Sequence, residues 1–416
     1  MGWDRAGHGD TAGRPARRAV VRAMALTGVA VGGASACVKG STAQADDDPT
    51  RRGGASRSPS APVITIEPGG EAGAVAPGGR VTVRVDGGRL TEVTVRAEDT
   101  DSFAGELSRD ESVWTSTALL GPGVRYTVSA RAQGDGGRDA AESVEITTAE
   151  AGETFVGEYS PEKNSVVGVG MPVSIVFSKP IGDKAAVERG LSVTCEPGVE
   201  GAWHWMTHRD GRDRVDFRPK EFWRPGTRVT LRMSLSGVDN GDGLLGTQQR
   251  VVKFRIGDAV VTEVDVRNKT MTVTRNGEKL RAQPVLISAG KPGYDTWSGT
   301  MVVLGKVPDL RMDSSTVGIY GPEAYDIGHV KWDVQLTPSG TYTHAAPWNE
   351  GKFGRINYSH GCIGMSTADA QWFYDQVHLG DPVTVTGSAE RTVDTNNGYG
   401  GWNVDWEAWK AGSALA

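Results

Sequence analysis

The sequence predicts a mainly β protein that contains several domains. At 416 residues the chain is too long for one ordinary domain and suggests about two to four. Its 57 glycines are about twice the average usage and lack the three-residue period of collagen. Long stretches alternate apolar and polar residues, which is the period of half-buried strands. Together these observations favour many short strands joined by glycine-rich turns.

Charge and cysteine content exclude several classes of protein. The formal net charge of -6 argues against a general nucleic-acid binder, which carries a basic excess. The three cysteines, Cys37, Cys195 and Cys362, lie far apart and form no CxxC pair. A zinc knuckle or a disulfide scaffold is therefore not predicted, and each cysteine needs its own interpretation.

Residues 1–37 predict an export segment. A basic stretch containing the pair Arg17-Arg18 precedes an apolar run of small residues, 23–36, which is too short to span a bilayer but typical of a signal sequence. The arginine pair resembles a twin-arginine export signal. Residues 38–62 have almost no apolar side chains and predict a disordered linker. The expected location is therefore the cell envelope, outside the cytoplasm.

Two processing routes remain open after the apolar run. Cys37 follows three small residues and is a candidate for the lipid-bearing first residue of a lipoprotein. Alternatively, Ala43-Gln44-Ala45 offers a cleavage site that releases a soluble protein beginning at Asp46. In the first case a lipid on Cys37 anchors the protein to the outer face of the plasma membrane. No other membrane contact is predicted.

Two stretches, 63–149 and 150–257, predict β-sandwiches of the immunoglobulin-like type. Both alternate apolar and polar residues between Gly/Asp turns. A weak internal repeat matches Pro122–Val128 with Pro225–Leu231 at an offset of 103 residues, which indicates a duplicated domain. The Cys…Trp…Cys signature of antibody domains is absent, which favours bacterial Ig-like modules.

Other patterns in the second stretch are interpreted as structural. Cys195 lies on an alternating strand and is expected to be a buried core residue. His204 and His208, four apart on a strand, would stand about 13 Å from each other, too far to share one metal. Asp239–Gly243 lacks the ligand spacing of a calcium loop and predicts a hairpin turn.

The residues that indicate chemistry lie in the stretch 258–387, around Cys362. A thiolate is a good nucleophile for acyl transfer, and a nearby imidazole can deprotonate it. Two histidines accompany the cysteine, His360 two residues before it and His344 eighteen before it. Gly361 permits a tight bend whose backbone N–H groups can stabilise an oxyanion. A catalytic cysteine is therefore favoured over a structural one.

A short helix is predicted directly after this cysteine. Ser366-Thr-Ala-Asp369 is typical of a helix start, and residues 370–377 form its body, which ends near Gly380. A cysteine just ahead of a helix N-terminus is expected to have a lowered pKa. The sequence therefore predicts a reactive thiol.

These residues carry a resemblance to a known family. Ser359-His360-Gly361-Cys362 with its upstream His344 resembles the L,D-transpeptidase catalytic domain, also called the YkuD domain. Further matches lie at 312–316, 346–348 and 371–374, so that the resemblance covers about residues 259–387. The layout of export segment, two Ig-like domains, catalytic domain and Trp-rich tail is similar to the mycobacterial-type enzymes.

The resemblance implies a peptidoglycan cross-linking enzyme. Cys362 would attack the diaminopimelate carbonyl of a tetrapeptide stem, release D-alanine and form a thioester, which an acceptor amine resolves into a 3→3 cross-link. His344 would be the general base, oriented by the backbone carbonyl of Ala345. The N–H groups of Gly361 and Cys362 would form the oxyanion hole. His360 would shape the site, with a direct proton role less favoured.

Substrate contacts are implied at five further positions. They are Tyr325, then Tyr320 as a second choice for the lid aromatic, and Trp348, Ser359 and Asn357. The implied partners are peptidoglycan stem peptides and, as covalent inhibitors, carbapenem-type β-lactams. No metal, organic cofactor or nucleic acid is implied.

Two positions depart from the family pattern. Ala345 stands where close relatives often have Ser, which a role for the backbone carbonyl tolerates. Gly364 stands where the family usually has Asn or Arg, and this removes a substrate contact. The donor preference of the enzyme is therefore left open.

Two alternative functions also stay open. An L,D-carboxypeptidase would use the same residues with water as the acyl acceptor, and sequence does not separate the two activities. A wall-binding structural protein with an inactive catalytic fold is a different class of function. The intact pair of Cys362 and His344 argues against that second alternative.

The last stretch, 388–416, is a Trp-rich extension. Trp402, Trp406 and Trp409 fall at i, i+4 and i+7, which predicts one face of a short helix. This helix is expected to pack onto the catalytic domain or the neighbouring Ig-like domain and to stabilise the protein.

Overall fold

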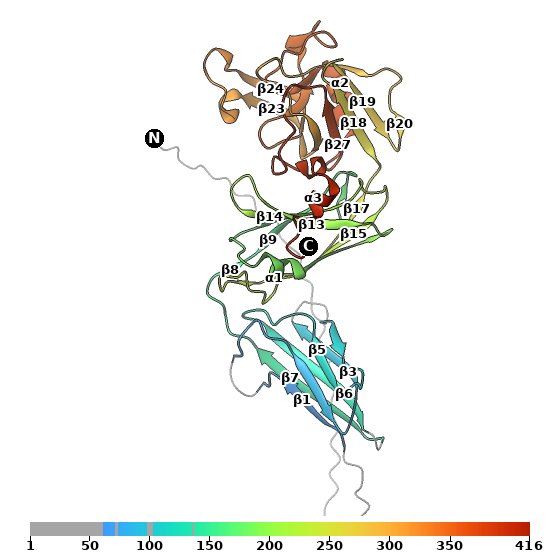
Figure 1. The fold of residues 1–416 in the computed structure, drawn as a ribbon, viewed down its shortest axis with the longest axis vertical. Coiled ribbons are helices and arrows are strands. Elements are labelled where there is room, and N and C mark those ends of the chain that lie inside the picture. Colours follow the sequence, from blue (N-terminus) through green and yellow to red (C-terminus); the bar gives the residue numbers. More distant parts are fainter. Residues whose placement is uncertain (1–60, 71–73, 98–102, 135–136) are drawn as a thin grey trace, which may run out of the picture. The chain divides into compact units, whose positions relative to one another are not determined.

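The computed structural model describes residues 61–70, 74–97, 103–134 and 137–416, and most of them lie in or between β-strands (Figure 1). The mainly β fold class is confirmed. The predicted export segment, with Cys37, lies outside the described residues. Within the described part, no helix is both long and apolar enough to cross a membrane.

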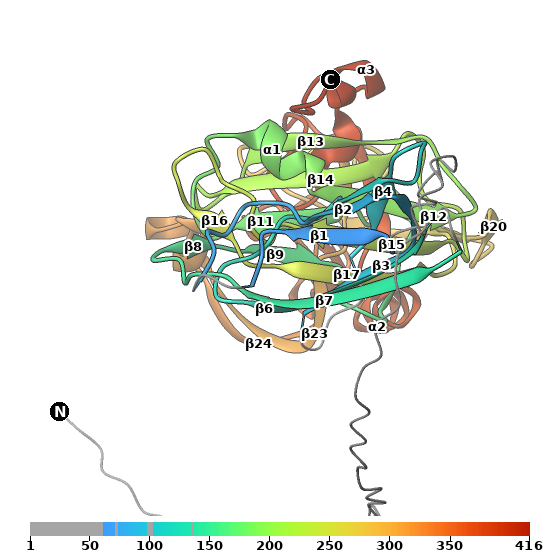
Figure 2. The ribbon, with the colours of Figure 1, turned by 90° about the horizontal axis from the view of Figure 1, so that it is seen from below.

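The first sandwich consists of two sheets that pack face to face (Figure 2). The order β1-β2-β5-β4 is built from β1 (Val63–Glu67), β2 (Thr82–Asp86), β4 (Gly105–Leu107) and β5 (Val113–Ser116). The order β3-β6-β7 is built from β3 (Gly88–Ala97), β6 (Arg125–Gly134) and β7 (Asp139–Thr147). Alternation decides what is buried, since Tyr126, Val128 and Ala130 of β6 face the core while their neighbours face outward.

The second sandwich has two four-stranded sheets. One sheet, of order β10-β17-β15-β12, contains β10 (Val166–Val167), β12 (Leu191–Glu196), β15 (Arg228–Ser234) and β17 (Gln249–Ile256). The other, of order β13-β14-β11-β9, contains β9 (Gly157–Ser160), β11 (Val173–Phe177), β13 (Gly201–Thr207) and β14 (Asp213–Pro219). The short strands β8 (Thr154–Phe155) and β16 (Leu245–Gly246) pair with each other, and α1 (Lys184–Arg189) precedes β12.

The internal repeat corresponds to equivalent structure in the two sandwiches. Strands β6 and β15 begin at Arg125 and Arg228, which are 103 residues apart. Each follows a turn whose glycine has positive φ, +64° at Gly123 and +79° at Gly226, a conformation that favours glycine. The repeated turn therefore fixes where the same core strand starts in both copies.

A ten-stranded sheet forms the C-terminal part (Figure 1). Its order is β22-β27-β18-β19-β21-β26-β25-β24-β23, and β20 pairs with β19. In chain order the strands are β18 (Val260–Asp265), β19 (Thr270–Arg275), β20 (Glu278–Lys279), β21 (Val285–Ser288), β22 (Gly299–Val302), β23 (Gly305–Asp313), β24 (Asp326–Gln335), β25 (Tyr342–Ala345), β26 (Ile363–Met365) and β27 (Pro382–Thr386). Single 3-10 turns lie at η1 (Ser314–Val317), η2 (Gly321–Glu323) and η3 (Pro347–Asn349).

The helix predicted after Cys362 is confirmed. It is α2 (Thr367–Gln376), and the side chain of its N-cap Ser366 accepts a hydrogen bond from the backbone N–H of Asp369. Ala370 and Phe373 of α2 are buried in the core of the C-terminal sheet. The helix therefore packs against the strands that carry the predicted catalytic residues.

The C-terminal extension differs from the prediction. Trp402 lies in a separate 3-10 turn, η4 (Gly400–Asn403), and only Trp406 and Trp409 lie in α3 (Trp406–Lys410), so the single helix is wrong. The three indoles still surround one side chain, Arg218. Its guanidinium lies 4.9, 5.3 and 4.6 Å from the ring centres of Trp402, Trp406 and Trp409. The extension thus packs on β14 and β13 of the second sandwich, and η4 also contacts β22.

Three further residues of the second sandwich were interpreted from the sequence as structural, and only the burial of Cys195 differs from that expectation. Cys195 is half-buried rather than buried, because β12 is an edge strand of its sheet. His204 stacks on Trp409 with ring centres 4.4 Å apart, and its Nδ1 lies 2.9 Å from the Trp409 carbonyl. His208 instead pairs with Asp210 at 2.8 Å, so that the two histidines have separate partners.

Candidate active site

Two short parallel strands position the proposed nucleophile and base. His344 lies on β25 and pairs in register with Gly364 of β26, and Cys362 directly precedes β26. Because side chains alternate along a strand, Cys362 shares a face with position 364 and therefore with His344. Both side chains line one pocket of about 230 Å³.

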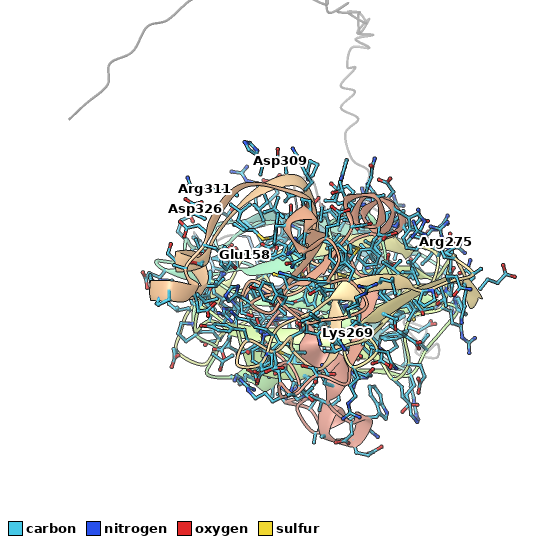
Figure 3. The ribbon with its side chains drawn as sticks, turned by 90° about the horizontal axis from the view of Figure 1, so that it is seen from above. Glu158, Lys269, Arg275, Asp309, Arg311 and Asp326 are labelled. Atoms are coloured by element: carbon cyan, nitrogen blue, oxygen red, sulfur yellow. The ribbon has the colours of Figure 1, made fainter. Side chains whose placement is uncertain are left out.

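The pocket is formed by three segments and is largely apolar. Its lining residues are Met312, Tyr325, Ile327, His344, Ala346, Trp348, Asn349, Tyr358, Ser359, His360, Cys362 and Gly364. The first three belong to the β23–β24 hairpin, whose strands are joined near its tip by the ion pair of Arg311 and Asp326 (Figure 3). The hairpin therefore forms one wall of the pocket.

His344 is held in one tautomer. Its Nδ1 lies 2.8 Å from the backbone carbonyl of Ala345, and because a carbonyl only accepts, Nδ1 carries the proton. The other ring nitrogen, Nε2, is left with a lone pair. The ring is 5% exposed and stacks against Trp348, with ring centres 5.9 Å apart. Burial lowers the pKa of His344, so the imidazole is neutral at rest.

The thiol of Cys362 is also neutral at rest. Burial raises its pKa to about 11, and the nearby charge of Asp333 acts in the same direction. The expected lowering of this pKa by the helix is therefore wrong. The strand β26 separates Cys362 from the helix N-cap Ser366, so burial of the thiol outweighs the helix dipole. The sulfur lies 3.5 Å from the carbonyl oxygen of Gly340.

The loop before Cys362 is fixed by its own hydrogen bonds. Gly361 has φ of +116°, which favours glycine. Its N–H donates to the Ser359 hydroxyl at 3.1 Å, and that hydroxyl donates to the Cys362 carbonyl at 2.5 Å. Thr296 donates to the carbonyl of Gly361 at 2.9 Å. To bind an oxyanion, the N–H of Gly361 would have to leave Ser359.

His360 connects this loop to the hairpin. Its Nε2 lies 2.7 Å from a carboxylate oxygen of Glu323, which also accepts from Lys291 at 2.5 Å. Lys291 and then His360 hold the pKa of Glu323 below its usual value. The ring of His360 lies between Tyr294 and Tyr325, at centre distances of 4.8 and 5.2 Å. His360 is therefore suited to holding the loop before Cys362 in position, because its Nε2 faces Glu323.

The structure brings only some predicted substrate contacts into the pocket. Tyr325, Trp348 and Ser359 line it, and burial raises the pKa of Tyr325 to about 12. Tyr320 is 70% exposed and does not line the pocket. The Asn357 amide donates to the Val266 carbonyl and accepts from the N–H of Ala289, so it connects backbone segments instead of facing the pocket.

Several residues of the site were not singled out from the sequence. Ile327 of β24 lies two residues after Tyr325, and both line the pocket. No sequence pattern points to Glu323, because only folding brings it beside His360. At Gly364 a side chain would place its Cβ 2.9 Å from the Cβ of Ala346, so the glycine allows β26 to pass close to that residue.

Asp333 is a buried carboxyl close to the proposed catalytic pair. Its exposure is 0%, and neither carboxyl oxygen has a hydrogen-bond partner within the described residues. Strands β24 and β25 are antiparallel, and Val334 pairs with Thr343. If this register is continued by one residue, Asp333 lies opposite His344. Burial raises the pKa of Asp333 to about 7.

A buried cysteine and a histidine whose Nδ1 is fixed line one pocket, and this arrangement suits a cysteine-nucleophile acyltransferase. Comparison with known proteins agrees with this class. Residues 259–385 match the L,D-transpeptidase catalytic domain family, YkuD. Residues 72–239, which include parts of both sandwiches, match the bacterial Ig domain family.

Curated relatives place the chain more narrowly. It is 38% identical to L,D-transpeptidase 2 of Mycobacterium tuberculosis, over 79% of this chain and 79% of that protein. It is 32% identical to L,D-transpeptidase 5 of the same species, over 86% and 78%. A solved L,D-transpeptidase in complex with imipenem is 33% identical and covers 57% of this chain and 100% of its own, with a TM-score of 0.49. The chain belongs to the L,D-transpeptidase family.

Proposed function

We propose that this protein forms 3→3 cross-links in peptidoglycan through a thioester on Cys362. The donor is a tetrapeptide stem, and its diaminopimelate carbonyl is the site of attack. The observation that carries this proposal is the placement of Cys362 and His344 on one face of adjacent parallel strands, in one pocket. The substrate lies outside the cytoplasm, which agrees with the export segment that the sequence predicts.

His344 acts as a general base during the attack, rather than as the partner of a preformed thiolate. Both groups are neutral at rest, because burial raises the thiol pKa and lowers the imidazole pKa. Nδ1–H is occupied by the Ala345 carbonyl, so Nε2 takes the thiol proton as the S–C bond forms. The imidazolium then gives this proton to the amine of D-alanine as the C–N bond breaks.

The second half of the reaction reverses the proton transfer. The side-chain amine of an acceptor diaminopimelate attacks the thioester carbonyl, a new C–N bond forms and the C–S bond breaks. His344 removes the proton from the attacking amine and returns it to the sulfur of Cys362. No redox step or added cofactor is needed, because every proton and electron pair remains on these groups.

The oxyanion of each tetrahedral intermediate is bound by the N–H groups of Gly361 and Cys362. The positive φ of Gly361 supports this role, because it turns the loop where a backbone oxyanion site would form. The N–H of Gly361 exchanges its Ser359 partner for the oxyanion. A carbapenem acylates the same sulfur when the thiol opens its β-lactam ring, and the apolar pocket wall accommodates the adduct.

The test is a product analysis with a purified disaccharide-tetrapeptide. The expected result is release of D-alanine together with a cross-linked dimer, both detected by mass spectrometry. His344→Ala should lower kcat/KM about 10²- to 10⁴-fold, the usual contribution of a general base. Release of D-alanine without dimer would instead assign an L,D-carboxypeptidase. Absence of both products would favour an inactive wall protein.

A further inference from the structure

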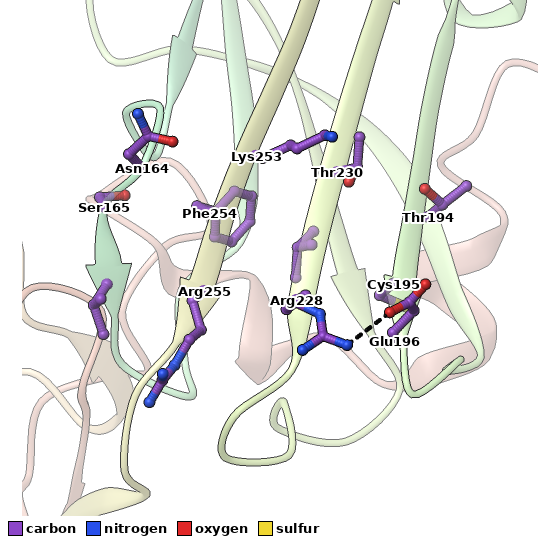
Figure 4. A pocket seen from close by; sticks show the side chains of 12 residues that line it. Asn164, Ser165, Thr194, Cys195, Glu196, Arg228, Thr230, Lys253, Phe254 and Arg255 are labelled. Atoms are coloured by element: carbon purple, nitrogen blue, oxygen red, sulfur yellow. Dashed lines mark hydrogen bonds and ion pairs between the residues drawn. The ribbon is translucent and has the colours of Figure 1, made fainter.

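One sheet of the second sandwich presents an open, basic face. In the sheet β10-β17-β15-β12, alternation points Arg228 and Arg232 of β15 outward, together with Lys253 and Arg255 of β17. The face is hollowed by about 650 Å³ next to these strands (Figure 4). An aromatic side chain on the same hollow, Phe254, is only 4% exposed and faces the core.

The register of this sheet places like charges opposite each other. Arg228 pairs with Arg255, and Thr230 pairs with Lys253. Like charges at directly opposite positions destabilise a sheet. The single acidic residue of the hollow, Glu196, lies 3.0 Å from Arg228 and leaves Arg255 and Lys253 unneutralised (Figure 4).

A second hollow extends the positive charge; it is lined by four residues of the first sandwich and otherwise by this sheet and the segments next to it. Its lining residues include four cations, Lys163, Arg189, Arg232 and Arg250, and no acid. The two hollows therefore bring seven cations together with one carboxylate, in a protein whose net charge is -6. Apart from Arg228, none of these cations has an ion pair or a side-chain hydrogen bond to any residue that the structure describes.

The other sheet of the same sandwich shows what its arginines do when a partner is present. Arg214 of β14 is buried against Asp216, with its Nε 2.7 Å from a carboxylate oxygen. Arg218 donates to the Val404 carbonyl at 2.8 Å beneath the indoles of the C-terminal extension. The chain itself covers that sheet. The β10-β17-β15-β12 sheet also carries several cations, and among the described residues only Glu196 forms an ion pair with one of them, Arg228.

We propose that this basic face binds the carboxylate groups of peptidoglycan stem peptides, as a wall-binding site separate from the catalytic pocket. This inference rests on the proposed function for the identity of the polymer. Guanidinium groups pair with carboxylates in a bidentate way, and the hydroxyls of Thr194 and Thr230 provide hydrogen bonds between them. The absence of an outward aromatic ring within the first hollow favours recognition of charge over stacking on sugars.

A wall-binding site on this domain would also assist the reaction. Retention on the wall raises the local concentration of stem peptides for the active site, because both sites bind the same polymer. The Ig-like domain would then contribute to catalysis through binding.

The test is co-sedimentation of the full chain with purified, insoluble peptidoglycan at about 0.05 M and about 0.5 M salt. Lys253→Glu/Arg255→Glu should weaken binding about tenfold at low salt, since two attractive contacts become repulsive and each 1.4 kcal/mol is tenfold. High salt should produce a similar loss in the unmodified protein, because exposed charges are screened. Lys253→Gln/Arg255→Gln, which removes charge at similar side-chain size, should give an intermediate loss.

The matched control is Arg84→Glu/Arg96→Glu, which reverses two exposed cations on the first sandwich and should leave binding unchanged. Amidation of the peptidoglycan carboxylates should abolish binding by the unmodified protein. Equal binding of all variants, or binding that ignores salt and amidation, would overturn the proposal. Binding to polyphosphate or to phosphatidylglycerol vesicles without binding to peptidoglycan would overturn it as well. Product analysis with a soluble stem peptide tests the proposed function independently of this result.

Discussion

At the residue scale, burial decides the chemistry of the two proposed catalytic side chains. Cys362 is 8% exposed and His344 is 5% exposed, and in each case burial favours the neutral form. The neutral pair agrees with the proposal that the proton moves from the thiol to the imidazole during the attack. Because the Ala345 carbonyl accepts from Nδ1–H of His344, the other ring nitrogen, Nε2, is free to receive the thiol proton.

Asp333 provides a test of this buried environment through the pH dependence of stability. Its pKa is about 7 in the folded protein, against a usual value near 3.8, so the folded state binds its proton more tightly. The stability it contributes is complete below about pH 4 and is lost as the pH rises to 7, by about 1.4 kcal/mol per pH unit within that window. Asp333→Asn removes this loss. The variant should therefore gain stability relative to the unmodified protein between pH 5 and pH 8.

Urea unfolding of the two proteins at pH 5 and pH 8 measures this gain. Asp381, whose pKa burial also raises to about 7, is present in both proteins and cancels in the comparison. A difference between the two proteins that is the same at both pH values would contradict an ionising carboxyl at position 333.

The sequence predicted the central residues of the site but not their electrostatics. Cys362 and His344 stand out because a Ser-His-Gly-Cys run with an upstream histidine is specific. The direction of the thiol pKa was predicted wrongly, because it depends on how deeply β25, β26 and the loop bury the sulfur. Asn357 and Tyr320 were expected at the substrate. Their side chains point elsewhere because of contacts that only the fold determines.

At the scale of elements, the sequence predicted strands and turns better than the C-terminal extension. The spacing of its tryptophans suggested one helix, but Asp405 caps a new helix and the Val404 carbonyl turns to accept from Arg218. Val404 is extended at this point, so η4 and α3 are separate elements. The partner, Arg218, lies 186 residues earlier in the chain, so no local pattern could reveal it.

Trp409 is the residue that anchors this extension. It is 1% exposed, and its Nε1 donates to the Ala202 carbonyl of β13 at 3.0 Å. Trp409→Ala should cost about 3–5 kcal/mol, the usual cost of truncating a buried aromatic residue. Thermal unfolding should show a lower Tm, with a smaller change for the half-buried Trp406→Ala. Deletion of residues 398–416 should lower the Tm at least as much as Trp409→Ala, and an unchanged Tm would contradict this role.

At the scale of the whole molecule, we propose four parts after the leader: sandwiches at 63–149 and 150–257, a catalytic domain at 258–387 and an extension at 388–416. The extension contacts the second sandwich through Trp409 and the C-terminal sheet through Asn403, whose side chain accepts from the N–H of Thr300 at 2.7 Å. The two sheets of the second sandwich therefore have different tasks, one covered by the extension and one proposed to face the wall.

The most direct test of the central claim is the intact mass of the protein after incubation with a carbapenem, followed by peptide mapping. The account predicts one covalent adduct per chain, located on Cys362 and absent in Cys362→Ala. Cys195→Ala should keep the adduct, because that half-buried thiol lies on another domain. An unmodified mass, or an adduct mapped to Cys195, would contradict the assignment of Cys362 as the nucleophile.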